Sequence, residues 1–249
     1  MRRKSPVITT STEPQYCSID LRLKILGRLP FFAGLSRESL QAINPWFVEV
    51  GYQPGDRIYT SGDPAERLFV VAEGKIKLLQ HAPNGRDVLL DILASGEFFG
   101  NPGILGAMEY SDTAQAQTPA CVLSIPSESF HKILDAHPTL AVKALVVMTE
   151  RLNAAQQRVM QLSALPAEQR VAFTLLKLGE KLGRENDSGL LIDVPLSRDE
   201  LAEMTGTTPE TVSRILSQLQ NQKIIDSGRQ WVSILNRPGL ERLAAKVLP

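Results

Sequence analysis

Residues 195–220 read P-L-S-R-D-E-L-A-E-M-T-G-T-T-P-E-T-V-S-R-I-L-S-Q-L-Q, and this stretch decides the fold of the C-terminal part of the chain. Ser197 stands three residues before Glu200, which is the spacing of a capping box, so a helix is predicted to begin there. Gly206 then predicts a sharp turn, because glycine adopts left-handed backbone without strain. The stretch therefore opens with a short helix that ends in a tight turn.

A second helix is predicted directly after this turn. Thr208 is a favourable N-cap and Pro209 is a favourable first helical residue, so the helix should run to about Gln220. Its apolar residues fall at helical spacing and form one stripe, made of Val212, Ile215, Leu216 and Leu219. Two short helices joined by a glycine turn form a helix-turn-helix, whose second helix enters the major groove of DNA.

The outward side of the second helix carries side chains that can read DNA. Arg214 can donate two hydrogen bonds to a guanine, and Glu210 can accept one from a cytosine or adenine amino group. The predicted DNA contacts are Thr208, Glu210, Thr211, Ser213, Arg214, Ser217, Lys223 and Arg229. Glu210 and Arg214 are also four residues apart, a spacing that equally suits an exposed ion pair worth roughly 0.3–0.5 kcal/mol.

The segment that follows predicts a β-hairpin, with strands at 223–225 and 231–235 and a turn at 226–229. A hairpin directly after a recognition helix is a wing, and its Lys223 and Arg229 can hold phosphates. The motif E-T-V-S-R-I-L at 210–216, followed by this winged segment, resembles the DNA-reading module of the CRP/FNR family of bacterial regulators.

Composition sets limits on the rest of the chain. The 249 residues are 43% hydrophobic, which suits one or two domains with real cores, and 27 basic residues balance 27 acidic ones. DNA binding must therefore rest on a local surface. No apolar run approaches the roughly 18 residues of a membrane span, and no apolar signal core follows the basic residues 2–4. Two cysteines, Cys17 and Cys121, argue against a disulfide scaffold, so we expect a cytoplasmic protein.

The N-terminal half predicts a β-roll. Residues 1–20 have the composition of a flexible tail, and helices are expected at 21–29 and from Ser36 to about residue 47. Between 48 and 126, turn signals recur every eight to twelve residues, which is typical of a barrel or jelly roll. Segments 55–56, 62–63, 68–71, 74–77 and 96–100 resemble the cyclic-nucleotide-binding-domain superfamily, so the resemblance spans about residues 21–243.

A long helix is predicted after Pro138. Its apolar residues alternate in steps of four and three, and they are Ala141, Leu145, Met148, Leu152, Ala155, Val159 and Leu162. This heptad pattern is typical of a two-stranded coiled coil, although a helix packed on its own β-domain would also show apolar periodicity. A dimer is favoured because two recognition helices must lie about 34 Å apart on a two-fold DNA site.

Pro166 marks a hinge at the end of this helix. The expected organisation is a tail at 1–20, a β-roll sensor at 21–137, a dimerisation helix at 138–165 and a winged helix-turn-helix domain at 166–249. Within the last of these, a helix is expected at 170–183 and a short strand at 189–194. The predicted fold class is therefore α+β.

The chain lacks residues that bind cyclic AMP in the family it resembles, and this affects which effector is expected. Family members that bind cyclic AMP carry a Glu after the Phe-x-Gly turn and an Arg-Ser pair further on, where this chain has Asn101 and Tyr110-Ser111. Loss of the arginine removes the bidentate cation that a cyclic phosphate needs. An iron-sulfur cluster needs about four thiolates, and the chain has two cysteines. The expected effector pocket comprises Phe98, Phe99, Asn101, Tyr110 and Ser111.

Heme is the other cofactor that the resemblance suggests. Segments 110–116, 213–216 and 232–237 are similar to the dissimilative nitrate respiration regulator branch, which responds to nitric oxide through heme. The possible axial ligands are His81, His131 and His137. Phe98, Phe99, Ile104, Leu105 and Met108 would suit heme or another apolar effector, and they would serve equally as barrel core.

The remaining expectations concern activity and partners. No HExxH pair, G-x-S-x-G elbow or P-loop is present, so no enzyme is predicted. The resemblance, through Glu210, Ser213 and Arg214, implies a palindrome of two TTGAT-type half-sites. Pro209 departs from the CRP pattern, in which an arginine precedes the Glu. The hairpin at 83–86 resembles one that contacts RNA polymerase in FNR. A cyclic-nucleotide module without DNA binding is the third class considered, and the winged segment argues against it.

Overall fold

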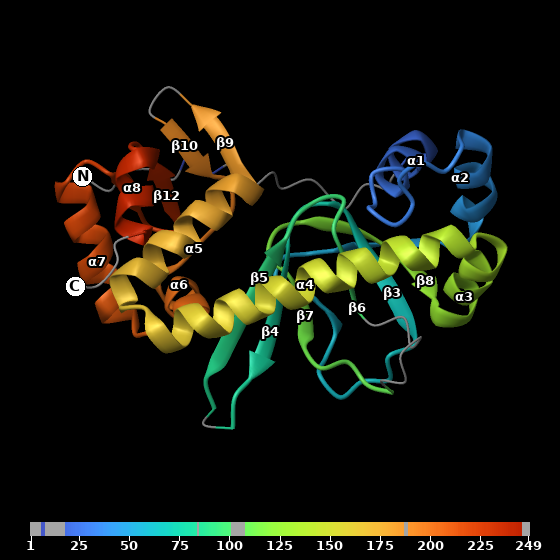
Figure 1. Cartoon of the computed structure of the whole chain (residues 1–249), viewed down its shortest axis with the longest axis horizontal. Coiled ribbons are helices and arrows are strands. Elements are labelled where there is room, and N and C mark those ends of the chain that lie inside the picture. The colour runs from blue at the N-terminus through green and yellow to red at the C-terminus, as the bar shows by residue number, and fades with distance from the viewer. Residues whose placement is uncertain (1–5, 8–17, 84, 101–107, 187–188, 246–249) are drawn as a thin grey trace. The chain divides into compact units, whose positions relative to one another are not determined.

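The computed structural model describes residues 6–7, 18–83, 85–100, 108–186 and 189–245 (Figure 1). The chain divides into two compact units. Among the described residues, the first comprises those within 18–85 and 90–155, and the second comprises those within 156–245 together with 6–7 and 86–89.

Two antiparallel sheets form the β-roll of the first unit. One sheet has the strand order β1-β8-β3-β6, with bounds Val48–Tyr52, Ala120–Pro126, Arg67–Glu73 and Phe98–Gly100. The other has the order β2-β7-β4-β5, with bounds Arg57–Tyr59, Thr113–Ala116, Ile76–His81 and Asp87–Leu93. This architecture, with its C-terminal winged helix-turn-helix, confirms the predicted fold class.

Strand β3 shows why the roll has two cores. Successive side chains of a strand point to opposite faces of the sheet. Leu68 and Val70 therefore pack into a core shared with helices, while Phe69 and Val71 pack into a second core between the sheets. Both faces of β3 are buried, so its sequence is a continuous apolar run rather than an alternating one.

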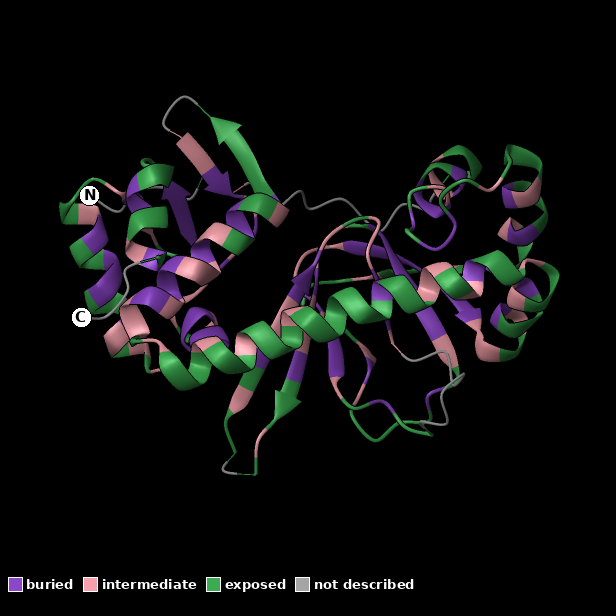
Figure 2. Cartoon of the chain, in the orientation of Figure 1, coloured by how far each residue is buried: buried purple, intermediate pink, exposed green. Residues whose placement is uncertain are grey.

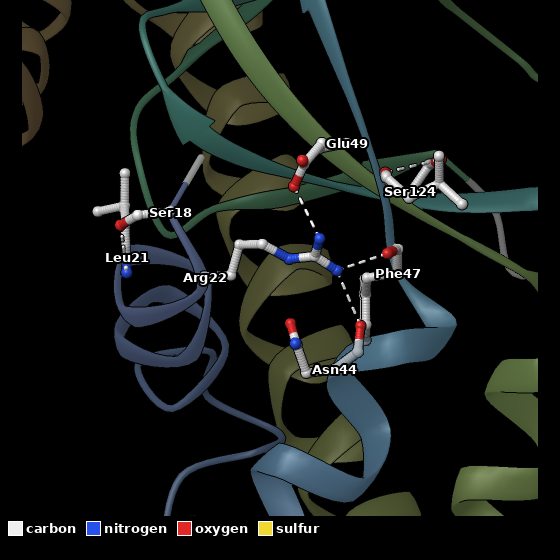
Figure 3. Close-up of polar contacts among 8 residues, drawn as sticks. Ser18, Leu21, Arg22, Asn44, Phe47, Glu49 and Ser124 are labelled. Carbon is white, nitrogen blue, oxygen red and sulfur yellow. Dashed lines mark hydrogen bonds and ion pairs between the residues drawn. The ribbon is translucent and has the colours of Figure 1, made fainter. Parts of the chain in front are cut away.

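Helices cover the outer face of the first sheet and complete the first core. They are α1 (Ile19–Leu26), α2 (Arg37–Ile43), the 3-10 turn η1 (Asn44–Trp46) and α3 (Ser127–Ala136). Arg22 fastens α1 to the roll through an ion pair with Glu49 at 2.7 Å and hydrogen bonds to the carbonyls of Asn44 and Phe47, as Figure 3 shows. The helix predicted to run to residue 47 ends at Ile43, because the chain turns at Pro45 into η1.

Helix α4 (Pro138–Ala164) is 27 residues long, and Leu140 and Val147 are its buried residues. Figure 2 shows that much of its surface is exposed along its whole length. A helix with so few buried residues gains little stability from packing within this chain.

In its described residues, the second unit combines a four-stranded sheet of order β11-β12-β10-β9 with the C-terminal part of α4 and the helices that follow it. The elements are α5 (Ala167–Leu182), β9 (Gly183–Asn186), β10 (Gly189–Ile192), α6 (Arg198–Thr205), α7 (Pro209–Asn221), β11 (Ile225–Gly228), β12 (Trp231–Ile234) and α8 (Arg237–Ala244). The predicted strand at 189–194 ends at Ile192 and pairs with β9, which we did not predict.

The predicted wing is shifted in the structure. Its first strand is β11, not 223–225, and its two-residue turn is Arg229–Gln230, because Gly228 pairs with Trp231. Lys223 lies at the end of α7 with a left-handed φ of 55°, which a strand does not allow.

Cys121 lies in the first core and is disulfide-bonded, although the cysteine count argued against a disulfide scaffold. Cys17 lies outside the described residues. In the part of the chain that the structure describes, no helix is both long enough and apolar enough to cross a membrane.

Candidate nucleic-acid interface and ligand cavity

The helix-turn-helix forms because its capping chemistry is complete. Ser197 Oγ accepts a hydrogen bond from the Glu200 backbone N–H at 3.1 Å, and Glu200 Oε2 accepts one from the Ser197 N–H at 2.9 Å. Helix α6 ends at Gly206, which adopts the left-handed conformation at φ 59° and ψ 44°. Thr208 then caps α7 by accepting from the Thr211 N–H at 3.3 Å. These local bonds fix where both helices begin and end.

Helix α7 buries its predicted apolar stripe and presents the opposite side to solvent. Val212 and Leu219 are fully buried, and Ile215 and Leu216 are almost fully buried. The predicted DNA contacts Thr208, Glu210, Ser213, Arg214 and Ser217 are exposed, and Thr211 is half-buried.

Glu210 and Arg214 do not form the ion pair that their spacing allows. Neither residue takes part in an ion pair within the described part of the chain. A hydrogen bond from its own backbone N–H, and to a smaller extent one from the Thr208 hydroxyl, holds the pKa of the Glu210 carboxyl below its usual value. The carboxyl is therefore ionised at neutral pH. Both charged groups are therefore open to solvent and to a DNA duplex.

The wing is tied to both helices of the helix-turn-helix. Arg198 at the start of α6 donates to the Gly228 carbonyl at 2.8 Å and to Ser227 Oγ at 3.3 Å. Gln220 at the end of α7 donates to Asp226 Oδ1 at 2.7 Å. Burial lowers the pKa of Arg198, as expected for a guanidinium partly enclosed by the hairpin. These bonds hold the wing at a fixed position relative to α7.

Lys223 and Arg229 are both exposed, one at the end of α7 and the other at the tip of the wing. Exposed basic side chains such as these can bind DNA phosphates.

Arg170, which sequence analysis missed, fastens the turn of the helix-turn-helix to the end of α4. It donates to three backbone carbonyls, those of Thr205 at 2.8 Å, Gly206 at 3.2 Å and Leu165 at 2.8 Å. The carbonyls at a helix C-terminus carry partial negative charge, so a guanidinium is a favourable partner for them. No spacing in the sequence indicates the contacts with Thr205 and Gly206, because these acceptors are backbone groups 35 and 36 residues away.

A cavity of about 430 Å³ lies in the first unit between β6, the segment before β7, and helices α3 and α4. Apolar lining residues include Phe31, Leu68, Phe98, Phe130, Ala144, Leu145 and Met148. The polar side of the lining is formed by Tyr110, Ser111, Asp112 and Arg151.

The residues predicted for an effector pocket separate in the structure. Phe98, Tyr110 and Ser111 line the cavity. Phe99 instead packs in the second core, where its ring stacks on Phe69 at 5.2 Å. Asn101, like Ile104 and Leu105, lies outside the described residues, and Met108 is 86% exposed.

The Tyr110 hydroxyl is already occupied. It donates to the Arg67 carbonyl at 3.0 Å and accepts from the Arg67 N–H at 3.1 Å, while the ring stacks on Tyr59 at 3.8 Å. Burial raises the pKa of Tyr110. Tyr110 thus forms part of the wall of the cavity and offers a ligand a ring surface rather than a free hydroxyl.

Arg151 and Asp112 supply the charged groups of the cavity. The Arg151 guanidinium lies 3.7 Å from the centre of the Phe98 ring and donates to the Phe98 carbonyl at 2.5 Å. Asp112 Oδ1 accepts from the Tyr59 hydroxyl at 2.7 Å. Burial raises the pKa of Asp112, although the Tyr59 bond and Arg151 oppose this, and burial lowers the pKa of Arg151. Neither residue was predicted, because their significance comes from the cavity they share.

The lining does not fit a histidine-ligated heme. His131 is exposed on α3, His81 is exposed at the end of β4, and His137 is half-buried at the end of α3. None of the three is among the residues that line the cavity. Among the described residues, no group of three His, Cys, Asp or Glu side chains is placed to hold a metal ion.

Each of the two units contains a segment that matches a known protein family. Residues 49–137 match the cyclic nucleotide-binding domain family, and residues 169–243 match the Crp-like helix-turn-helix domain family. The chain is 31% identical over 216 residues to a probable transcriptional regulator, flp, of Lacticaseibacillus casei, covering 87% of this chain and 96% of that protein. It is 30% identical over 215 residues to the cyclic AMP receptor protein of Thermus thermophilus, covering 86% and 96% of the two chains.

Solved structures show the same likeness over the whole fold. FixK2 from Bradyrhizobium japonicum superposes with a TM-score of 0.72 at 27% identity, covering 81% of this chain and 99% of that one. A CRP/FNR-family transcriptional regulator of Thermus thermophilus gives a TM-score of 0.65 at 27% identity, covering 80% and 99%. The chain therefore belongs to the CRP/FNR family of transcription regulators.

Proposed function

We propose that this regulator binds a palindromic DNA site as a homodimer, through α7 and the wing, and that a small molecule in the β-roll cavity controls its DNA affinity. The observation that carries the proposal is the exposed face of α7, where Arg214 and Glu210 have no ion-pair partner among the described residues. Charged side chains without an ion-pair partner on a recognition helix are free to hydrogen-bond to the edges of DNA bases.

The exposed side of α4 supports the dimer. Val142, Leu145, Leu152 and Val159 follow one another in steps of three, seven and seven, and each is more than half exposed. Such a stripe is a coiled-coil seam when a second helix covers it. Of the other predicted seam residues, Ala141 and Met148 line the cavity, Ala155 is exposed, and Leu162 lies near Gly206.

Leu145 links the two halves of the proposal, because it lines the cavity and also belongs to the exposed stripe. A ligand that repositions Leu145 would change the seam on which the dimer depends. A ligand changes DNA affinity only if it binds the two states of the protein differently, and this shared residue offers a route for that difference.

The half-site we propose is of the TTGAT type, read by Glu210, Ser213 and Arg214. The hairpin between β4 and β5, at 83–86, is the proposed contact with RNA polymerase. The proposal includes no enzymatic activity, because the relatives that the chain matches are transcription regulators. Nitric oxide sensing through heme is not carried forward, because no described histidine lines the cavity.

The test is selection of bound sequences from a pool of random duplexes by the full-length protein at fixed, moderate salt. The proposal predicts enrichment of an inverted repeat with half-site centres about 10 base pairs apart, the spacing of one helical turn. Enrichment of a single half-site, or of no sequence, would contradict it.

A further inference from the structure

The chemistry of the cavity narrows the class of ligand that fits it, and this inference rests on the proposed regulatory role of the cavity. Its volume of about 430 Å³ lies in the range of about 300–1,000 Å³ that is usual for small-molecule sites. Apolar side chains from β3, β6, α3 and α4, together with Phe31, form most of the described lining. The body of the ligand must therefore be largely apolar.

The β-roll supplies no cation to the described lining. The Tyr110 hydroxyl is held by the Arg67 backbone, and a tyrosine side chain carries no positive charge. Ser111 can offer a hydroxyl but no charge. An anionic ligand would thus depend on Arg151 alone among the described lining residues.

Arg151 is poorly placed to bind an anion. Its guanidinium shares the cavity lining with Asp112, whose carboxyl group interacts electrostatically with it. It also holds the Phe98 carbonyl and ring. A carboxylate or phosphate bound to Arg151 would also lie near Asp112 in the same cavity, and the two negative charges would repel each other.

A neutral hydroxyl fits the same groups without that penalty. Asp112 keeps acceptor capacity beyond its bond from Tyr59, and Arg151 keeps N–H donors beyond its bond to Phe98. A hydroxyl both donates and accepts, so it can bond to both residues at once. We propose that the cavity binds an uncharged small molecule that has an apolar body and one hydroxyl-like end directed at Asp112 and Arg151.

Two probes that share an apolar chain and differ in head charge test this directly: octan-1-ol and octanoate, with cyclic AMP as a third. Each is titrated into the full-length protein and followed by calorimetry at neutral pH. We expect one molecule of octan-1-ol to bind per chain. Octanoate should bind with an affinity at least about tenfold lower, and cyclic AMP should give no heat of binding. Equal or tighter binding of octanoate, stoichiometric binding of cyclic AMP, or no binding of octan-1-ol would each overturn the proposal.

Two variants of cavity residues test whether octan-1-ol binds in this cavity. Ala144→Trp places a large ring in the cavity and should abolish binding of octan-1-ol, whereas Ala136→Trp, at an exposed position on α3, should leave it unchanged. Asp112→Asn removes one carboxylate and should reduce the preference for octan-1-ol over octanoate by several fold. If Ala144→Trp does not fold, the Asp112→Asn variant still tests the proposal. An unchanged preference for octan-1-ol over octanoate in this variant would contradict the proposed repulsion between Asp112 and an anionic ligand.

DNA binding is measured in parallel, by anisotropy of a labelled duplex with and without octan-1-ol. If octan-1-ol binds and DNA affinity stays constant, the ligand class is supported and the regulatory role is refuted. If the duplex is not bound under either condition, the proposed function fails while the calorimetric result on ligand class still stands.

Discussion

At the scale of single residues, Arg214 gives the sharpest test of how the recognition helix reads DNA. We expect Arg214→Ala to relax the preference at one guanine in each half-site, because a good bidentate contact discriminates by about 1–3 kcal/mol. Sequence selection by the variant measures this. Arg242→Ala removes the same charge from exposed α8 and should leave the preference intact. An unchanged preference in the Arg214 variant would remove this residue from the base-reading set.

Asp112 gives a prediction for the pH dependence of stability. Burial raises its pKa in the folded chain, so folding favours the protonated form. The stabilising contribution is complete below the unfolded pKa of about 3.9 and is lost as the pH rises through the higher, folded value. Asp112→Asn mimics the neutral acid, so its unfolding free energy should exceed that of the wild type at neutral pH and approach it at acidic pH. Urea titrations at several pH values measure this difference, which should not be constant with pH.

Sequence analysis identified residues whose role depends on local chemistry and missed residues whose role depends on distant ones. The Thr208 cap and the exposure of Glu210 and Arg214 were predictable because helix capping and helical spacing are local. Arg151 and Arg170 were missed, since the Phe98 carbonyl that Arg151 binds lies 53 residues away and the Thr205 carbonyl that Arg170 binds lies 35 residues away. No single-sequence pattern encodes such a pairing.

At the scale of elements, Arg170 makes the junction between α4 and the helix-turn-helix testable. Arg170→Met removes three hydrogen bonds to carbonyls, and bonds to charged groups are worth about 1.5–3 kcal/mol when buried. Because the guanidinium is partly exposed, we expect a loss of about 2 kcal/mol in unfolding free energy, together with weaker DNA binding.

Arg184→Met is the matched control for this variant. It breaks an exposed ion pair with Asp193 at 3.4 Å, which should matter by less than about 1 kcal/mol. Denaturant unfolding and duplex anisotropy are measured for both variants. Equal effects of the two substitutions would show that Arg170 has no special role at this junction.

The elements themselves differ in how well sequence predicted them. Helices α6 and α7 begin at their predicted caps, because a side chain three residues away fixes each start. The wing strand was placed too early, since Lys223 takes the left-handed conformation for which glycine is the usual signal. Strand β9 was missed because G-R-E-N shows no apolar alternation and all four of its residues are exposed.

At the scale of the whole molecule, the exposed stripe of α4 predicts the assembly. Leu152 is 58% exposed on that stripe, so Leu152→Asp should place a charge in the seam and convert a dimer to monomers. Gln157→Asp adds the same charge on another side of α4, at an exposed residue, and should leave the dimer intact. Sedimentation velocity distinguishes the two, and a wild-type protein that sediments as a monomer would refute the proposed seam.

The order of elements along the chain was predictable, because turn signals, heptad spacing and capping boxes each occupy a short stretch. The division of the α4 side chains between the cavity and solvent was not predictable. Ala141 and Met148 fit the heptad as well as Leu152 does, yet they line the cavity while Leu152 is exposed. Periodicity gives the apolar face of a helix but does not say which partner covers each part of it.

The most direct test of the account is a titration of the full-length protein onto two labelled duplexes, one with two TTGAT-type half-sites and one with a single half-site scrambled. The account predicts two chains per intact duplex. It also predicts at least about a hundredfold weaker binding to the scrambled duplex, because several base contacts of about 1–3 kcal/mol each are lost together. One chain per duplex, or equal affinity for the two duplexes, would contradict dimeric recognition by α7.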